Sequence, residues 1–261
     1  MNRSSYYKWL NAKPVENDDE YVKTLIQEIY NYSKGTYGTE RITLAINRLG
    51  YKINKKRVHR LKKQLGLKAV IRKKYCIRKH QKQEVADNLL ERAFESLIPR
   101  DKFVTDVTEL KRIDDKRYFL HSILDLCGNV IEAYGISNHN DTDLAIESLK
   151  QIKKVRKGTL LHSDQGSPFT SHKYNEEAKK KNLTVSMSRV GNCYDNAAKE
   201  SFFGHFKEEF YIFYNPQSEA ELIENLSAFV KYYNEERLQI RLKGTPVEYR
   251  KNCRLALSCS G

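Results

Sequence analysis

"MSRVGNCYDNAAKESFFGHFKEEF", residues Met187 to Phe210, reads as a loop that runs into a helix with one strongly apolar side. At 100° per residue, Phe202, Phe206 and Phe210 share one face of this helix, which predicts that the helix packs on a core. Glu200 lies at the rim of that apolar stripe, where a carboxylate needs a polar or charged partner. The stretch therefore predicts a helix that is anchored on one side and presents a carboxylate on the other.

The polar side of the same helix has a second feature. Asn196, Glu200, Gly204 and Lys207 fall within about 40° of one line along the helix. Gly204 leaves room for the backbone of a substrate, and Lys207, about 10.5 Å beyond Glu200, is placed to hold a phosphate. The alternative is that Glu200 and Lys207 are ordinary surface charges of an amphipathic helix, with Lys207 paired to a neighbouring glutamate.

The chain before this helix predicts a sheet. Strand patterns occur at 102–110, 116–126, 129–137, 158–166 and 183–188, with a Cys-Gly-Asn turn joining the second and third, and helical patterns occur at about 141–153 and 174–181. A hairpin followed by alternating helices and strands predicts a mixed α/β sheet that is covered by helices on both faces.

Two carboxylates fall at key places in that sheet. Asp106 lies within a central strand, and Asp164 lies where the next central strand ends, so the helix with Glu200 would pack over both. Three oxygen ligands without His or Cys suit Mg²⁺ or Mn²⁺ rather than zinc. Two such ions about 3.5–4 Å apart activate the attacking oxygen and stabilise the leaving oxygen in phosphodiester cleavage. Because strands often end in an aspartate for structural reasons, the pattern alone leaves both interpretations open.

The net charge of +14 is concentrated in one segment. Residues 34–82 contain seventeen Lys or Arg and one acidic residue, a net charge of +16, so the rest of the chain carries −2. This distribution predicts a module that binds a polyanion, attached to a nearly neutral body. A solvated basic surface is the alternative.

Helical periodicity places that charge on a small helical module. Three helices are predicted, at about 22–29, at 39–49 with Thr39 as its cap and Leu49 facing inward, and at 54–65 with Asn54 as its cap. Two short helices joined by a Gly-containing turn, the second of them basic, are typical of a helix-turn-helix, although any small helical hairpin can show this spacing. The candidate DNA contacts on the last helix are Lys55, Lys56, Arg57, Arg60, Lys62 and Lys63.

Several protein classes are disfavoured. No run of 18 apolar residues and no signal-peptide pattern occurs, so we expect a cytoplasmic protein without a membrane partner. The five cysteines are odd in number and form no C-x-x-C, which predicts free thiols rather than a disulfide framework or a zinc site.

Motifs along nearly the whole chain resemble one family, the OrfB component of bacterial insertion-sequence transposases with a split OrfA/OrfB frame and a DDE, retroviral-integrase-like core. Fifty-seven residues separate Asp106 from Asp164, and 35 separate Asp164 from Glu200, the spacing that names the D,D(35)E group. Lys207 stands seven residues after the glutamate, where the family carries a basic residue. The matching segments are NRSSYYKWL (2–10), YGTERI (37–42), TDVT (105–108), HSDQGSPFTS (162–171), 187–209 and 232–250.

The resemblance implies an RNase H-like mixed five-stranded sheet with helices on both faces, preceded by a small basic helical domain. It divides the chain into a helix-turn-helix-like DNA-binding region (1–67), a basic linker and helix (68–97), a catalytic core (98–215) and a helical tail (216–261). Asp106, Asp164 and Glu200 would be the metal-binding triad for two Mg²⁺ or Mn²⁺ ions, with Lys207 and Asn196 touching DNA.

The implied activity is that of a polynucleotidyl transferase with an endonuclease step. It would cleave the terminal inverted repeats of an element and join the freed 3′-OH to target DNA. An OrfA partner or an OrfAB fusion, a homo-oligomer on DNA and association with the bacterial nucleoid are also implied. Two alternatives remain, namely a DNA-binding regulator without strand-transfer activity and a plain nuclease on the same fold.

Overall fold

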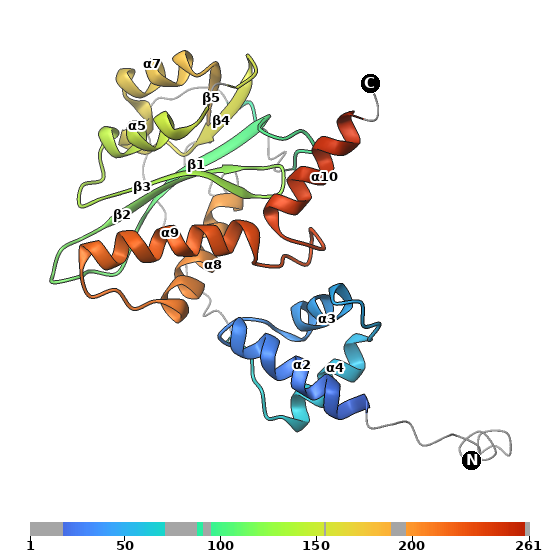
Figure 1. Cartoon of the computed structure of the whole chain (residues 1–261). Coiled ribbons are helices and arrows are strands. Elements are labelled where there is room, and N and C mark those ends of the chain that lie inside the picture. The colour runs from blue at the N-terminus through green and yellow to red at the C-terminus, as the bar shows by residue number, and fades with distance from the viewer. Residues whose placement is uncertain (1–17, 71–87, 91–94, 154, 189–196, 259–261) are drawn as a thin grey trace, which may run out of the picture. The chain divides into compact units, whose positions relative to one another are not determined.

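The computed structural model describes residues 18–70, 88–90, 95–153, 155–188 and 197–258 (Figure 1). The chain divides into two compact units, Met1–Ile71 and Arg72–Gly261, which are described separately below. In the described part of the chain, no helix has both the length and the apolar character needed to cross a membrane.

The first unit consists of three described helices, α2 (Asp18–Tyr32), α3 (Thr39–Arg48) and α4 (Lys55–Gln64). Asn54 caps α4 as predicted, since its side chain accepts a hydrogen bond from the Arg57 N–H at 2.8 Å. The helices enclose a small apolar core of Val22, Ile26, Ile42, Ile46, Val58 and Leu61.

Two local predictions for α3 are wrong. Thr39 is the first helical residue rather than the cap, which is Gly38 in extended conformation without a side-chain hydrogen bond. Leu49 is 67% exposed instead of facing inward, because it follows the last helical turn and lies beside the turn at Gly50.

The second unit is built on a mixed five-stranded sheet with the order β3-β2-β1-β4-β5. The strands β1, β2 and β3 pair antiparallel, whereas β4 pairs parallel to β1 and β5 parallel to β4. The prediction of a mixed sheet is therefore confirmed. The strands are β1 (Lys102–Glu109), β2 (Phe119–Asp125), β3 (Val130–Ser137), β4 (Thr159–Ser163) and β5 (Leu183–Met187).

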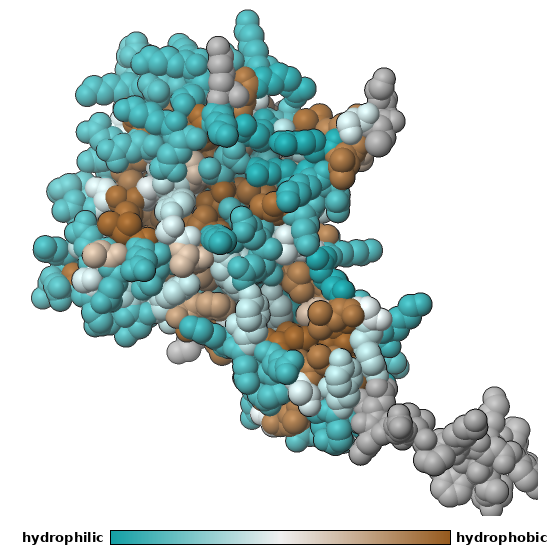
Figure 2. Space-filling view, in the orientation of Figure 1, coloured by the Kyte–Doolittle hydropathy of each residue, from teal (hydrophilic) through white to brown (hydrophobic). Residues whose placement is uncertain are grey.

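Helices cover both faces of this sheet (Figure 1). One face packs against α5 (Thr142–Gln151), the short α6 (Ser167–Thr170) and α7 (His172–Lys180). The other packs against α8 (Ala197–Phe213) and α9 (Glu219–Glu235). The surface over α5 and α7 is largely hydrophilic in Figure 2, as expected for helices whose apolar sides face the sheet.

The last helix, α10 (Pro246–Ser258), lies against the turn between β2 and β3. Gly128 in this turn has φ +86°, and a Cβ there would stand 2.7 Å from the Pro246 carbonyl oxygen. Glycine is therefore required both for the backbone conformation and for the close approach of α10.

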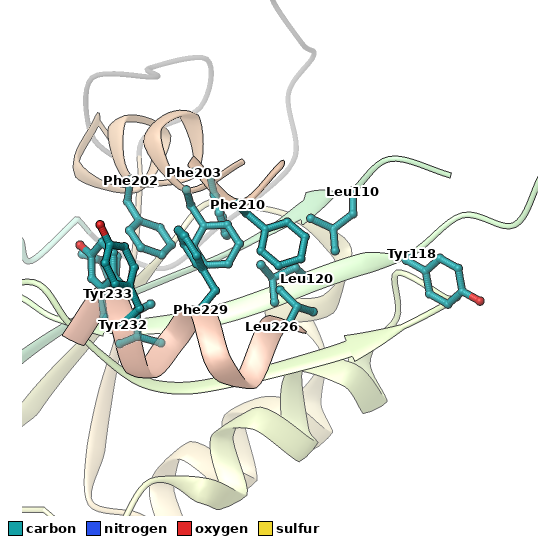
Figure 3. Close-up of a cluster of buried hydrophobic side chains, with 14 of the residues drawn as sticks. Leu110, Tyr118, Leu120, Phe202, Phe203, Phe210, Leu226, Phe229, Tyr232 and Tyr233 are labelled. Carbon is teal, nitrogen blue, oxygen red and sulfur yellow. The ribbon is translucent and has the colours of Figure 1, made fainter. Parts of the chain in front are cut away.

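Aromatic side chains of α8 and α9 pack against each other over the sheet (Figure 3). Phe206 packs edge-to-face on Phe229 with ring centroids 4.9 Å apart, and Phe202 does the same on Tyr233 at 5.4 Å. Phe202, Phe206 and Phe210 are all buried, which confirms the predicted apolar stripe. Because the stripe is buried, the rotation of α8 about its axis is fixed, and so is the direction in which its other side chains point.

A buried ion pair adds to this junction. Arg237, just after α9, donates from Nε and Nη2 to the two carboxylate oxygens of Glu209 on α8, at 2.6 and 2.7 Å. Both side chains are more than 90% buried. Arg237 is therefore a core residue, and α9 shares its core with α8 and the sheet.

Loss of one partner of this ion pair should destabilise the protein strongly, because the other charge stays buried without compensation. Arg237→Ala is expected to lower the free energy of unfolding by about 3–5 kcal/mol in urea denaturation. The control is Arg241→Ala, which removes an exposed ion pair with Glu95 and should cost less than about 1 kcal/mol. Equal losses in the two variants would contradict the role given to Arg237.

Candidate active site

The register of the sheet brings Asp106 and Asp164 together. In the parallel pair β1–β4, Val104 lies opposite His162, and each aspartate follows two residues further along its chain. Residues two apart in a strand point to the same face, and neighbouring strands lie about 4.8 Å apart. The two carboxylates therefore stand side by side, Asp106 in the middle of β1 and Asp164 just past the end of β4, on the face that α8 covers.

This proximity affects the protonation of both groups. The pKa of Asp106 is raised to about 7, mainly by removal of the carboxylate from water and next by the negative charge of Asp164. Desolvation also raises the pKa of Asp164, although Oδ1 of Asp164 accepts a hydrogen bond from the Gly166 N–H at 2.9 Å. Two carboxylates held this close favour a proton or a cation between them.

Glu200 lies in the first turn of α8 and is exposed. Its charge contributes to the raised pKa of Asp106, so it lies within electrostatic reach of that aspartate. Among the described residues, however, no three His, Cys, Asp or Glu side chains are gathered closely enough to hold a metal ion. The structure thus brings the two aspartates together and leaves Glu200 at the edge of the site.

Lys199, which the sequence did not single out, is fully buried at this site. Its Nζ donates to Oγ of Ser122 on β2 and lies 4.4 and 4.9 Å from the ring centroids of Phe203 and Phe202. Burial lowers the pKa of Lys199 to about 7, and the charge of Asp106 opposes this shift. The helical wheel contains the signal, because Lys199 projects about 100° from Glu200, into the middle of the phenylalanine stripe.

Lys207 is half-buried rather than freely solvated. Its Nζ donates to the Glu109 carbonyl oxygen at the end of β1, at 3.4 Å. Desolvation lowers the pKa of Lys207, whereas the charges of Glu109 and Asp106 raise it. This lysine therefore lies at the end of β1, within electrostatic reach of Asp106. Glu209, a possible partner in the surface-charge interpretation, binds Arg237 instead.

His162 and Asn196 are the remaining polar residues that the sequence places near the site. His162 is fully buried, and its Nδ1 lies 2.9 Å from Oγ of Ser186 on β5, which ties two strands together. Asn196 lies outside the described residues. Cys127 and Cys253 are free thiols, and the other three cysteines also lie outside the described part of the chain.

The candidate DNA contacts on α4 have different environments. Lys55 pairs with Glu40, and Arg57 and Arg60 both bind the Asp19 carboxylate, with nitrogen–oxygen distances of 2.7 Å. Lys62 is only 6% exposed and packs over the Tyr30 ring, because it projects from the same side as Val58 and Leu61; it is therefore withdrawn as a DNA contact. Lys56 and Lys63 are exposed and lie two turns apart on one side of the helix.

The donor set fits a hard divalent cation. Asp106 and Asp164 supply closely spaced carboxylate oxygens in a partly desolvated place, and Glu200 can supply another if the first turn of α8 approaches them. Oxygen donors of this kind select Mg²⁺ or Mn²⁺. The chemistry of these three carboxylates therefore suits such an ion, but Glu200 can become a ligand only if the first turn of α8 moves towards the aspartates.

A mixed five-stranded sheet of this order, with helices on both faces and paired aspartates on its central strands, has the architecture of an RNase H-like integrase core. The comparisons with known families agree. Residues 16–75 match an HTH-like domain, and residues 97–193 and 200–253 match two integrase core domain families.

Known relatives define the family more narrowly. The putative transposase InsK of insertion sequence element IS150 from Escherichia coli K12 is 37% identical over 255 residues, which cover 95% of this chain and 89% of the relative. Transposase InsF of insertion sequence IS3A from the same organism is 29% identical, over 79% of this chain and 75% of the relative. The chain belongs to the family of insertion-sequence transposases with an integrase core domain.

One solved structure supports the fold. The simian T-cell lymphotropic virus intasome, in complex with PP2A regulatory subunit B56 gamma, contains a chain that matches with a TM-score of 0.54 and 14% sequence identity. The match covers 86% of this chain and 74% of that one. At this identity the likeness concerns the fold alone.

The raised pKa of Asp106 predicts a pH-dependent stability in the absence of metal. The folded pKa lies above the unfolded value, so the contribution of Asp106 is fully present below about pH 4 and is lost as the pH rises through about 7. In EDTA, Asp106→Asn should therefore gain stability over wild type as the pH increases from 5 to 8, as measured by urea unfolding. The exposed Asp115→Asn is the control, and an equal pH profile in all three proteins would contradict the assignment.

Proposed function

We propose that this transposase cleaves DNA strands at the ends of its element and joins the freed 3′-OH to target DNA. In this proposal Asp106, Asp164 and Glu200 hold two Mg²⁺ or Mn²⁺ ions. The observation that carries it is the pairing of Asp106 with Asp164, because β1 and β4 place two desolvated carboxylates beside one helix that bears a third.

The side chains have separate roles in this mechanism. Asp106 and Asp164 form a fixed base on the sheet, and Glu200 completes the ligand set from α8. When bound, the ions supply charge stabilisation for the attacking and leaving oxygens of the phosphodiester. Lys207, close to Asp106 and bonded to the end of β1, binds a DNA phosphate beside the scissile one and positions it.

The DNA partner is proposed on chemical grounds. The basic first unit binds the terminal inverted repeats through Lys56 and Lys63 of α4, and DNA phosphates compete with Asp19 for Arg57 and Arg60. The division into end-binding, linker, catalytic and C-terminal regions (1–67, 68–97, 98–215 and 216–261) is part of the proposal. So are a homo-oligomer on DNA and an OrfA partner or OrfAB fusion.

The triad is tested by neutral, nearly isosteric substitutions. Asp106→Asn, Asp164→Asn and Glu200→Gln should each abolish Mg²⁺-dependent cleavage of duplexes that carry the element ends, because each removes a ligand charge. DNA binding should persist, since the basic unit is unchanged. The exposed Glu224→Gln on α9 serves as the control and should cleave normally.

The outcomes separate the candidate functions. Cleavage that survives in one variant removes that residue from the triad. Binding of element ends by the wild type, without cleavage in Mg²⁺ or Mn²⁺, would favour the DNA-binding regulator. Cleavage without joining to a target duplex would favour a plain nuclease.

DNA binding by the first unit should depend steeply on salt. With roughly 6–10 phosphate contacts, the affinity should fall about 10³–10⁵-fold between about 50 and 200 mM salt. Lys56→Ala and Lys63→Ala should each reduce the slope of log affinity against log salt by about 1. Lys62→Met should leave the slope unchanged, because this lysine is buried; the opposite pattern would reject the proposed face of α4.

Lys207 has its own test. Lys207→Ala should weaken positioning of the DNA end and reduce the salt slope by about 1, without loss of metal binding. Lys207→Arg should be milder because it keeps the charge. Binding and cleavage curves that coincide with those of wild type across the salt range would show that Lys207 does not contact the DNA.

A further inference from the structure

A buried lysine ammonium group is the least expected feature of the site. Lys199 is fully buried, whereas long cationic side chains usually keep their charge in water. A buried charge is tolerated when it is paired and hydrogen-bonded. The partners of Lys199 therefore indicate why it lies inside.

The β-ladder places this ammonium beside Asp106. In the antiparallel pair β1–β2, Asp106 lies directly opposite Ser122, so the two side chains share one face, with Cβ atoms about 5 Å apart. Nζ of Lys199 donates to Oγ of Ser122, which places it next to the Asp106 carboxylate. The rings of Phe202 and Phe203 lie near the ammonium and add cation–π attraction.

The negative charges near Asp106 favour a cation beside its carboxylate. Asp164 stands on the other side of Asp106, just past the end of β4, and Glu200 is within electrostatic reach of Asp106, so Asp106 carries the negative charge of its neighbours as well as its own. The charge of Asp106 in turn acts on Lys199. Lys207 also reaches Asp106, but its hydrogen bond holds it at the end of β1. Lys199 is the cation that the helix inserts beside the paired aspartates.

We propose that Lys199 is a positioning residue whose ammonium takes the place of a divalent ion beside Asp106 in the metal-free protein and leaves it when the metal binds. This inference rests on the proposed function, because it takes Asp106 and Asp164 as metal ligands. It explains why the two aspartates are together while Glu200 is not gathered with them. The cation already beside Asp106 is Lys199, and the third carboxylate is not needed until that cation departs.

The helix couples the two events. Lys199 and Glu200 are adjacent in the first turn of α8, about 100° apart around its axis. A rotation of this turn that withdraws Lys199 from Asp106 also brings Glu200 towards it. The phenylalanines and Glu209 hold the following turns in place, so the change is confined to the start of the helix.

The test is a double-mutant cycle on the full chain, with thermal unfolding in EDTA and Mg²⁺ binding by calorimetry. Lys199→Met keeps the length of the side chain and removes its charge. In EDTA it should lower the unfolding temperature of wild type by roughly 5–10 °C, since Asp106 loses its counter-charge. In the Asp106→Asn background the same change should cost little or nothing.

Mg²⁺ binding provides the second readout. Lys199→Met should bind Mg²⁺ about tenfold more tightly than wild type, because the competing ammonium is gone, and Lys199→Arg should not. Lys231→Met, which removes an exposed lysine from α9, is the matched control and should change neither property. If Lys199→Met folds only when Asp106→Asn is also present, the coupling is demonstrated directly.

Two results would overturn the inference. One is an equal drop in unfolding temperature with and without Asp106→Asn, which would make Lys199 a structural residue. The other is an unchanged Mg²⁺ affinity in Lys199→Met. Failure of the proposed function looks different, because wild type and Asp106→Asn would then bind Mg²⁺ equally.

Discussion

The junction between α8 and α9 is the constraint on which the site depends. Phe206 against Phe229 and the buried pair Glu209–Arg237 fix both the rotation of α8 about its axis and its position over the sheet. Because a helix turns 100° per residue, that rotation decides which side chains reach Asp106. It places Lys199 inside, Glu200 at the edge and Lys207 by the end of β1. The helix α9 and Arg237 thus hold in place the helix that covers Asp106 and Asp164, although neither is a candidate metal ligand.

The sheet places two negatively charged groups close together, and this charge has to be balanced. Asp106 and Asp164 are adjacent because β1 and β4 are parallel neighbours in register, and partial burial makes their ionised forms costly. A protein that holds such a pair without metal needs another source of positive charge. Lys199 and Lys207, both near Asp106, meet that need from α8, and a divalent ion meets it more strongly.

The features that depend on local pattern were predictable from the sequence. The five strands, the Asn54 cap and the phenylalanine stripe follow from periodicity and capping chemistry, and the paired aspartates follow from strand order. The features that were not predicted are charged side chains that are buried, although such side chains are usually exposed. Lys62, Lys199 and Arg237 are buried. Helical periodicity places Lys62 and Lys199 on the apolar sides of their helices, but the group that each of the three charges contacts lies on another element. Tertiary contacts of this kind leave no regular spacing in the sequence.

The metal site and the displacement of Lys199 can be observed together by diffraction from crystals of the full chain soaked in Mn²⁺, recorded at the manganese absorption edge. We expect anomalous density between the carboxylates of Asp106 and Asp164, with a Glu200 oxygen as a further ligand about 2.1–2.2 Å from the ion. The Lys199 ammonium should have moved away from Ser122. Manganese bound elsewhere, or bound beside Asp106 with Glu200 still exposed and Lys199 still buried, would contradict the account.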